Sequence, residues 1–192
     1  MIILASQSEA RSRLLAQAGV RFTVQTPAID ENSLKFRNHD ATTLAQDLAT
    51  AKSLSLSTTN PDCFVIGADQ TLRCKEIRLS KPGNTDTARN QLQQLRGKSH
   101  ILTSAVCVSK NGDILFQNCQ TAKLNMRNFS DEYLEHYLTI AGTAILNCVG
   151  SYQIEGQGIN LFSHIDGDIF TIQGLPLLPL LAFLRQAGEL PT

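Results

Sequence analysis

Several segments of this 192-residue chain carry side chains that could hold a phosphorylated ligand. Ser6-Gln7-Ser8 precedes a helical pattern, and Arg11 falls about one turn into it. Free N–H groups at a helix N-terminus attract anions, and a guanidinium can grip a phosphate through two hydrogen bonds. The alternative is that Ser8 only caps the helix and that Arg11 is a solvated surface residue. On this segment alone the alternative is favoured, because S-x-S before a helix is a weak signal.

Two acidic positions could bind a metal ion or activate water. Asp30-Glu31 follows an expected strand, and adjacent carboxylates in a loop suit Mg²⁺, although a solvated acidic turn would look the same. Asp69 directly follows the apolar run Cys63–Ala68. Carboxylates at strand ends of α/β enzymes often serve as metal ligands or bases, and a turn aspartate that caps the next segment is the alternative.

Lysines and a further carboxylate could complete such a site. Lys52 lies on an expected long helix, and Lys81 precedes Pro82, which favours extended backbone at the lysine. Both could join Arg11 around a polyphosphate, although most lysines are merely solvated. Glu155 lies in the glycine-rich segment 149–158, where backbone can approach a ligand closely. Its carboxylate could accept two N–H bonds from a base edge, and a glycine-rich surface loop is the alternative.

The elements that must position these residues alternate between strands and helices. Strands are expected over Ile2–Ala5, Arg21–Gln25, Cys63–Ala68, His100–Val108 and Asp113–Leu124, and over the glycine-rich stretch 150–172. Helices are expected from Ser8 to Gly19, over Ala41 to about Leu56, over Thr85–Leu95, from Ser130 to about Leu138, and after Pro176. Asn111-Gly112 predicts a tight hairpin. This order predicts a single α/β domain over residues 1–192, with a mixed β-sheet and flanking helices.

The composition disfavours several classes of function. Lys plus Arg and Asp plus Glu each number 17, so the net charge is +0, and we expect neither nucleic-acid nor membrane binding. The N-terminal apolar run is too short for a signal peptide or a membrane span. Five cysteines without C-x-x-C spacing favour a reduced, cytoplasmic setting, and a zinc site has little support.

Seven segments in order resemble the Maf family of nucleoside triphosphate pyrophosphatases along nearly the whole chain. They are LASQSEARSRLL, AIDE, LATAKS, VIGADQTL, LSKPGNTDTARNQLQQLRGKSH, VGSYQIEGQGINLF and IDGDIFTIQGLPLLPLLAFLR. The resemblance implies an inosine triphosphatase-like fold with two lobes around a nucleotide cleft. It implies hydrolysis of a nucleoside triphosphate between the α and β phosphates and dependence on Mg²⁺ or Mn²⁺. It leaves a homodimer open.

The resemblance also assigns roles to residues. It implies that Asp69 is the essential carboxylate and that Ser6, Arg11, Glu31, Lys52 and Lys81 surround the phosphates and the metal. Our mechanistic hypothesis has Glu31 and Asp69 hold the metal, with Asp69 also orienting or deprotonating the attacking water. Lys52, Lys81 and Arg11 would steady the transferred phosphoryl group and the departing pyrophosphate.

Departures from the common family pattern bear on the substrate. Glu9-Ala10-Arg11 stands where most members have Pro-Arg-Arg, and Asp69-Gln70 stands where they have Asp-Thr. Gln70 and Glu155 look instead like the subgroup that prefers 7-methyl-GTP, whose positively charged base with donors at N1 and N2 suits a carboxylate. That subgroup usually has a bulky aromatic residue at the position of Ala10, so an expected stacking partner is absent.

Three alternatives stay open. The same reaction could act on dTTP, UTP or CTP. A Maf-like pocket could sense a nucleotide without turnover, as a regulator of cell division, a role with which the family is also associated. A nucleic-acid-binding module is disfavoured by the zero net charge.

Overall fold

The computed structural model of the chain describes residues 1–37 and 40–191. Seven strands form one mixed sheet in the order β2-β1-β3-β5-β6-β7, with β4 paired to β3. The strands are β1 (Ile2–Ala5), β2 (Phe22–Gln25), β3 (Phe64–Cys74), β4 (Ile77–Leu79), β5 (Ser99–Lys110), β6 (Asp113–Met126) and β7 (Phe162–Asp166). β1 runs parallel to β2 and β3, whereas β3–β4 and β6–β7 are antiparallel. The prediction of a mixed sheet with flanking helices is confirmed.

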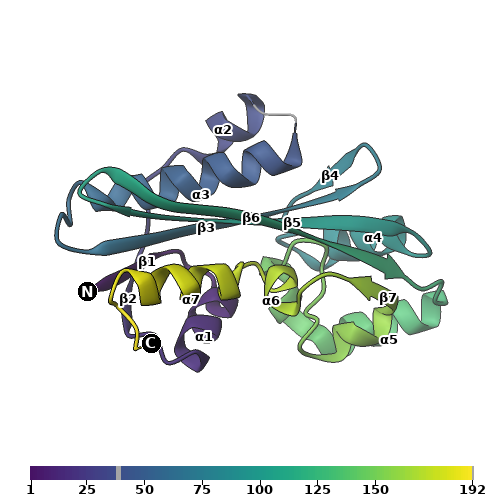
Figure 1. Cartoon of the computed structure of the whole chain (residues 1–192). Helices are drawn as coiled ribbons and strands as arrows, with labels where there is room; N and C mark the ends of the chain where they lie inside the picture. The colour runs from purple at the N-terminus through teal and green to yellow at the C-terminus, as the bar shows by residue number, and fades with distance from the viewer. Residues whose placement is uncertain (38–39, 192) are drawn as a thin grey trace. The chain divides into compact units, whose positions relative to one another are not determined.

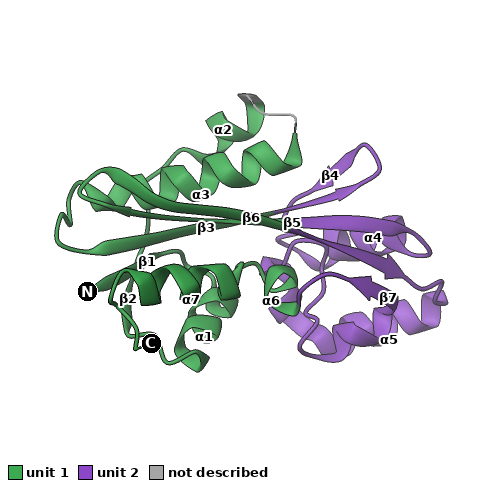
Figure 2. Cartoon of the chain, in the orientation of Figure 1, with its two compact units in different colours: residues 1–70, 103–120, 169–192 green, residues 71–102, 121–168 purple. Residues whose placement is uncertain are grey.

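The chain divides into two compact units, which Figure 2 colours separately. Unit 1 comprises residues 1–70, 103–120 and 169–192, and unit 2 comprises residues 71–102 and 121–168. The helices of unit 1 are α1 (Glu9–Gln17), α2 (Glu31–Arg37), α3 (Ala41–Ser57), α6 (Ile169–Ile172) and α7 (Leu177–Gln186). Unit 2 holds α4 (Thr85–Leu95), α5 (Asp131–Ala141) and the 3₁₀ helices η1 (Gly142–Asn147) and η2 (Gln157–Leu161).

Helices cover both faces of the sheet in unit 1, with α3 on one face and α1 and α7 on the other (Figure 1). All four residues of β1 are buried, as expected for a strand covered on both sides. Ile2 and Leu4 join the core under α1 and α7, while Ile3 and Ala5 belong to a separate cluster. The period of two along a strand explains this division.

Small residues bring α3 close to the sheet. Ala45 and Ala49 of α3 pack with Ala105 and Cys107 of β5. Gly67 of β3 lies so near the helix that an added Cβ would overlap the carbonyl oxygen of Ala49 and lie 2.5 Å from the Ser53 nitrogen. The helix axis can therefore approach β3 only if position 67 has no side chain.

Local sequence signals explain most elements. Ser8, Asp40, Asn84 and Ser130 each accept a hydrogen bond from the backbone three residues on, as N-caps do. Asn111 and Gly112 both have positive φ, 51° and 83°, which suits the primed turn of a two-residue hairpin. The predicted hairpin is confirmed.

The predicted glycine-rich strands over 150–172 are wrong apart from β7. Gly150 and Ser151 have φ of 83° and 64°, and η2 begins at Gln157. Gly150 thus serves a tight turn and not a strand, whereas Gly156 is extended but only precedes η2. β3 is also longer than the predicted Cys63–Ala68, because it continues through Asp69 and Gln70 to Cys74.

The cysteines and the lengths of the helices bear on two expectations from the sequence, a reduced setting and the absence of a membrane span. None of the five cysteines, all within the described residues, forms a disulfide, and Cys63, Cys74 and Cys107 are buried. Over residues 1–37 and 40–191, no helix has both the length and the apolar character needed to cross a membrane.

We expect Gly67→Ala to lower the free energy of unfolding by about 3 kcal/mol, because its methyl group would force α3 away from β3. Gly156→Ala is the control, since its Cβ would meet only the Gln153 carbonyl oxygen at 3.9 Å. Urea unfolding of both variants measures the difference. Equal stability of the two variants would contradict the close approach of α3.

A buried histidine in unit 2 gives a pH prediction. His100 is 1% exposed, its Nε2 lies 2.8 Å from the Tyr152 hydroxyl, and burial lowers its pKa to about 4. Because the folded pKa lies below the usual 6.5, the neutral form stabilises the fold fully above pH 6.5, and this contribution is lost as the pH falls towards 4. We expect the loss to reach about 3 kcal/mol in urea unfolding at a series of pH values.

His100→Gln cannot titrate in this range and should show a flatter profile between pH 6.5 and 4. His136→Gln, at an exposed position, should keep the wild-type slope. A wild-type slope in His100→Gln would show that another group is responsible.

Candidate active site

Asp69 lies inside β3 but beyond the end of the neighbouring strand. The parallel pairing of β1 with β3 ends at Ala5 opposite Gly67, two residues before Asp69. β2 ends in the same register, with Gln25 beside Ala5. Asp69 therefore stands past the carboxyl ends of two parallel strands, where open α/β sheets bind ligands. The prediction that β3 stops before Asp69 is wrong, because the strands that end here are β1 and β2.

Asp69 points to the α3 face and pairs with Lys52. The Lys52 ammonium lies 2.7 Å from Asp69 Oδ1 and 2.8 Å from Glu31 Oε1. The side chains of Lys52 and Asp69 are only 9% and 13% exposed. One buried cation thus joins a carboxylate from β3 to a carboxylate from α2. Lys52, Glu31 and Asp69, which are far apart in the sequence, form a single cluster.

Glu31 begins α2 and does not lie in a loop as predicted. Asp30 accepts hydrogen bonds from the nitrogens of Asn32 and Ser33, so the first acidic residue caps the helix and the second is left for the cluster. Lys35, one turn later, also contacts Glu31 at 2.9 Å. Burial alone would raise the pKa of Glu31, but hydrogen bonds and charge from Lys52 and Lys35 lower it to about 2.

Arg11 is buried and oriented by the protein, so the alternative that it is solvated is wrong. Its Nε donates to the Gly174 carbonyl oxygen at 2.8 Å and its Nη1 to Ser6 Oγ at 3.3 Å. Burial lowers the pKa of Arg11, and the charges of Asp69 and Glu31 act in the opposite direction. Ser8 is the N-cap of α1, as the alternative interpretation held.

The next residue of β3, Gln70, points to the other face of the sheet. Its amide nitrogen donates to the carbonyl oxygens of Thr171 and Ile172, both at 3.0 Å, and to Ser104 Oγ at 3.1 Å. Ala10, the position next to Arg11 on α1, is partly buried. All these contacts lie within unit 1.

Lys81 and Glu155 belong to unit 2 and are both exposed. Buried Gln91 of α4 connects their two segments, because its amide donates to the Ser80 carbonyl oxygen and accepts from Ser151 Oγ, each at 2.8 Å. Within unit 2, the turns before α4 and after η1 are thus tied together. The role of Lys81 and Glu155 towards the cluster of unit 1 stays a prediction.

The donor set suits a hard divalent cation with few protein ligands. Glu31 and Asp69 present carboxylate oxygens to one point, the Lys52 ammonium. Among the residues that the structure describes, no group of three or more His, Cys, Asp or Glu side chains could hold a metal. Mg²⁺ is commonly held by one or two carboxylates plus substrate phosphates, so two carboxylates fit that ion and do not fit a closed zinc site.

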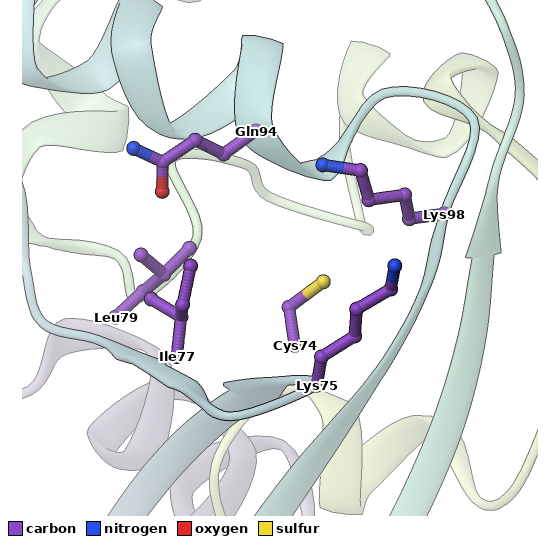
Figure 3. A pocket seen from close by; sticks show the side chains of 6 residues that line it. All are labelled: Cys74, Lys75, Ile77, Leu79, Gln94 and Lys98. Atoms are coloured by element: carbon purple, nitrogen blue, oxygen red, sulfur yellow. The ribbon is translucent and has the colours of Figure 1, made fainter.

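One pocket of unit 2 has none of the predicted site residues in its lining. Figure 3 shows its lining, with Lys75 and Lys98 beside Cys74 and with Ile77, Leu79 and Gln94 completing it. Its volume is about 50 Å³. Pockets for small organic ligands have volumes of roughly 300 Å³ or more, so this one cannot enclose a nucleotide.

Sequence reasoning missed the residues that support the site. Lys35 could have been found from its spacing of four to Glu31, had α2 been expected there. The carbonyl oxygens of Thr171, Ile172 and Gly174 act through the backbone, so residue types gave no signal for them.

The chain matches the model of the family described as Maf-like protein over residues 1–187. It belongs to the Maf-like family. A nucleoside triphosphate pyrophosphatase of Rhodospirillum rubrum is 47% identical over 98% of this chain and 96% of the relative. A 7-methyl-GTP pyrophosphatase of Brucella abortus is 42% identical over 96% of this chain and 95% of the relative. Among solved structures, a nucleoside-triphosphatase/dITP/XTP pyrophosphatase of Mycobacterium abscessus aligns at 15% identity and a TM-score of 0.45, over 99% of this chain and 97% of that one.

The Glu31 carboxylate of this Maf-like chain should respond to the loss of Lys52. We expect Lys52→Met to raise the pKa of Glu31 from about 2 towards 4.5, because a buried hydrogen-bond donor and its charge are removed. The wild-type protein gains stability from ionised Glu31 above pH 4.5 and loses it as the pH falls towards 2, and the variant should lack this loss. Carboxyl-carbon NMR titration measures the pKa directly.

Lys35→Met is the matched control. Lys35 contacts the same carboxylate, but its side chain is 38% exposed, so solvent screens its charge and the shift should be smaller. A shift in Lys35→Met equal to or larger than that in Lys52→Met would contradict the central place of Lys52.

Proposed function

We propose that this protein hydrolyses a nucleoside triphosphate to the monophosphate and pyrophosphate, with 7-methyl-GTP as its preferred substrate. The observation that carries the proposal is the Lys52 ammonium between Glu31 and Asp69, with the buried Arg11 nearby on α1. Cations and carboxylates at the ends of parallel strands suit a polyphosphate and a divalent ion. Membership of the Maf-like family and the activities named for its relatives support the same reaction.

In this proposal Glu31 and Asp69 would hold Mg²⁺ or Mn²⁺. When bound, the ion would offset phosphate charge and favour the departure of pyrophosphate. Glu31 is suited to this task because its pKa of about 2 keeps it ionised at neutral pH. Asp69 would also act as the base. Its Oδ1 accepts a hydrogen bond from Lys52, and its Oδ2 would take the proton of the attacking water.

The cations of the site would bind the phosphates. Ser6 and the Gly174 carbonyl hold the Arg11 guanidinium before substrate arrives, which reduces the entropic cost of gripping a phosphate oxygen. Lys52 would exchange part of its contact with the carboxylates for the transferred phosphoryl group. We assign Lys81 to the departing pyrophosphate, because the family resemblance implies that it is one of the residues around the phosphates.

Base choice would depend on Glu155 and on the space beside Ala10. 7-Methylguanine carries a positive charge and donors at N1 and N2, which a carboxylate complements. The 7-methyl-GTP pyrophosphatases of Brucella abortus and Brucella suis, 42% and 43% identical to this chain, support this choice of substrate. The Rhodospirillum rubrum relative, at 47%, is named without a base.

Pyrophosphate release from a panel of nucleotides tests the proposal. We expect 7-methyl-GTP to be hydrolysed faster than GTP, dTTP, UTP or CTP with Mg²⁺ or Mn²⁺, and no release with EDTA. Asp69→Asn should lower turnover by about 10²–10⁴-fold, because it removes the base while keeping the shape of the side chain. Asp113→Asn, at an exposed position of β6, should behave as wild type.

The outcomes separate the alternatives. Preference for a pyrimidine nucleotide would keep the enzyme and overturn the assignment of Glu155. Near-normal turnover of Asp69→Asn would remove Asp69 from the role of base. Binding of nucleotides without release of pyrophosphate would favour the regulator over the enzyme.

A further inference from the structure

The hydrogen bonds of the Gln70 side chain to the protein are all donated by its amide nitrogen. Its amide nitrogen has two hydrogens and lies within 3.1 Å of three acceptors, the carbonyl oxygens of Thr171 and Ile172 and the hydroxyl oxygen of Ser104. Ser104 itself donates to the Thr171 carbonyl at 2.7 Å, so its oxygen is left to accept from Gln70. Carbonyl oxygens cannot donate, so the nitrogen and not the oxygen of the Gln70 amide must face this group.

The two carbonyls belong to the last turn of a helix. α6 ends at Ile172, and the carbonyls of a last helical turn have no partner within the helix. Gly174 N also donates to the Thr171 carbonyl, at 3.1 Å, and closes the turn with φ of 98°, a conformation that favours glycine. Gln70 therefore fastens the turn 171–174 to the sheet.

The same turn orients Arg11. The Gly174 carbonyl accepts from Arg11 Nε at 2.8 Å. A Cβ built on Gly174 would lie 3.5 Å from Arg11 Nε and Nη2 and 3.6 Å from Gln70 Oε1, so Gln70 and Arg11 both border this glycine. An arginine has five donors in a fixed plane, and fixing Nε sets the direction in which the others point.

We propose that Gln70 is a positioning residue for Arg11, which acts through the turn 171–174 and controls the grip on the phosphate end of the ligand. Both of its amide hydrogens are committed to protein oxygens, so the amide holds the turn and only Oε1 is left for a ligand. The inference rests on the proposed function for the task of Arg11. A change at Gln70 should therefore weaken the binding of every ligand that carries the polyphosphate, whatever its base.

Inorganic tripolyphosphate is the probe, because it has phosphates and no base. We expect Gln70→Met, which keeps the length and removes the donor, to weaken tripolyphosphate binding about tenfold in calorimetry with Mg²⁺. The ratio of kcat/KM for 7-methyl-GTP and GTP should stay at the wild-type value. In a proton–nitrogen spectrum, the Arg11 Nε–H should exchange faster with solvent than in the wild-type protein.

Gln117→Met is the matched control. Gln117 is also in unit 1 and hydrogen-bonded through its amide, to Thr50 Oγ1 at 2.8 Å, but it is exposed on β6. It should bind tripolyphosphate as wild type does. Should Gln70→Met fail to fold, Gly174→Ala disturbs the same turn from its other end, because alanine disfavours φ of 98°, and the same loss is expected.

Two results together would overturn the inference and make Gln70 a base-reading residue. Gln70→Met would bind tripolyphosphate as strongly as the wild-type protein, and its ratio of kcat/KM for 7-methyl-GTP and GTP would change. Failure of the proposed function looks different. In that case the wild-type protein would release no pyrophosphate from any nucleotide, while the effect of Gln70→Met on tripolyphosphate binding and on Arg11 exchange would still decide the positioning role.

Discussion

The buried ammonium of Lys52 is the interaction on which the rest of the site depends. A lysine side chain that is 9% exposed is costly to bury unless carboxylates accompany it, and here Glu31 and Asp69 do so at 2.8 and 2.7 Å. The arrangement requires α2, α3 and β3 to meet at one point. Every feature that sets the distance between α3 and β3 therefore also sets the geometry of the carboxylates. Gly67 does this by leaving room, and Ser53 does it by donating to the Val65 carbonyl at 2.7 Å.

The cluster also explains how a chain of zero net charge can hold a polyanion. Arg11, Lys35 and Lys52 gather around Glu31 and Asp69, so cations are concentrated at this point although the whole chain is neutral. The carboxylates hold Lys35 and Lys52 in place before a ligand arrives. In the proposed function, a divalent ion would bind those carboxylates and leave the cations for the phosphates.

The sequence singles out the side chains that meet in the cluster, but it misplaces the backbone that carries them. Asp69 was selected as a strand-end carboxylate, yet β3 runs on to Cys74, and the end that matters is that of β1 at Ala5. Strand pairing is a long-range property, so a local apolar run could not reveal which strand stops first. Glu31 was selected as a loop residue because α2 has seven residues and a weak pattern, whereas its neighbour Asp30 is the cap. The glycines near 150 predict bends in strands, because composition alone does not distinguish a positive φ from a bend.

The adjacent residues Asp69 and Gln70 show how the strand divides two tasks. Successive side chains of β3 point to opposite faces, so Asp69 meets Lys52 on α3 and Gln70 meets the turn after α6. A change at Gln70 can therefore alter the site without touching the ion pair, and a change at Asp69 leaves the turn in place. Arg11 is where the two sides meet, since Gly174 fixes its Nε and the charges of Asp69 and Glu31 act on its guanidinium. A shift of β3 by one residue would exchange the two faces and place the Gln70 amide against Lys52. The Lys52 ammonium would then be left with Glu31 as its one carboxylate partner.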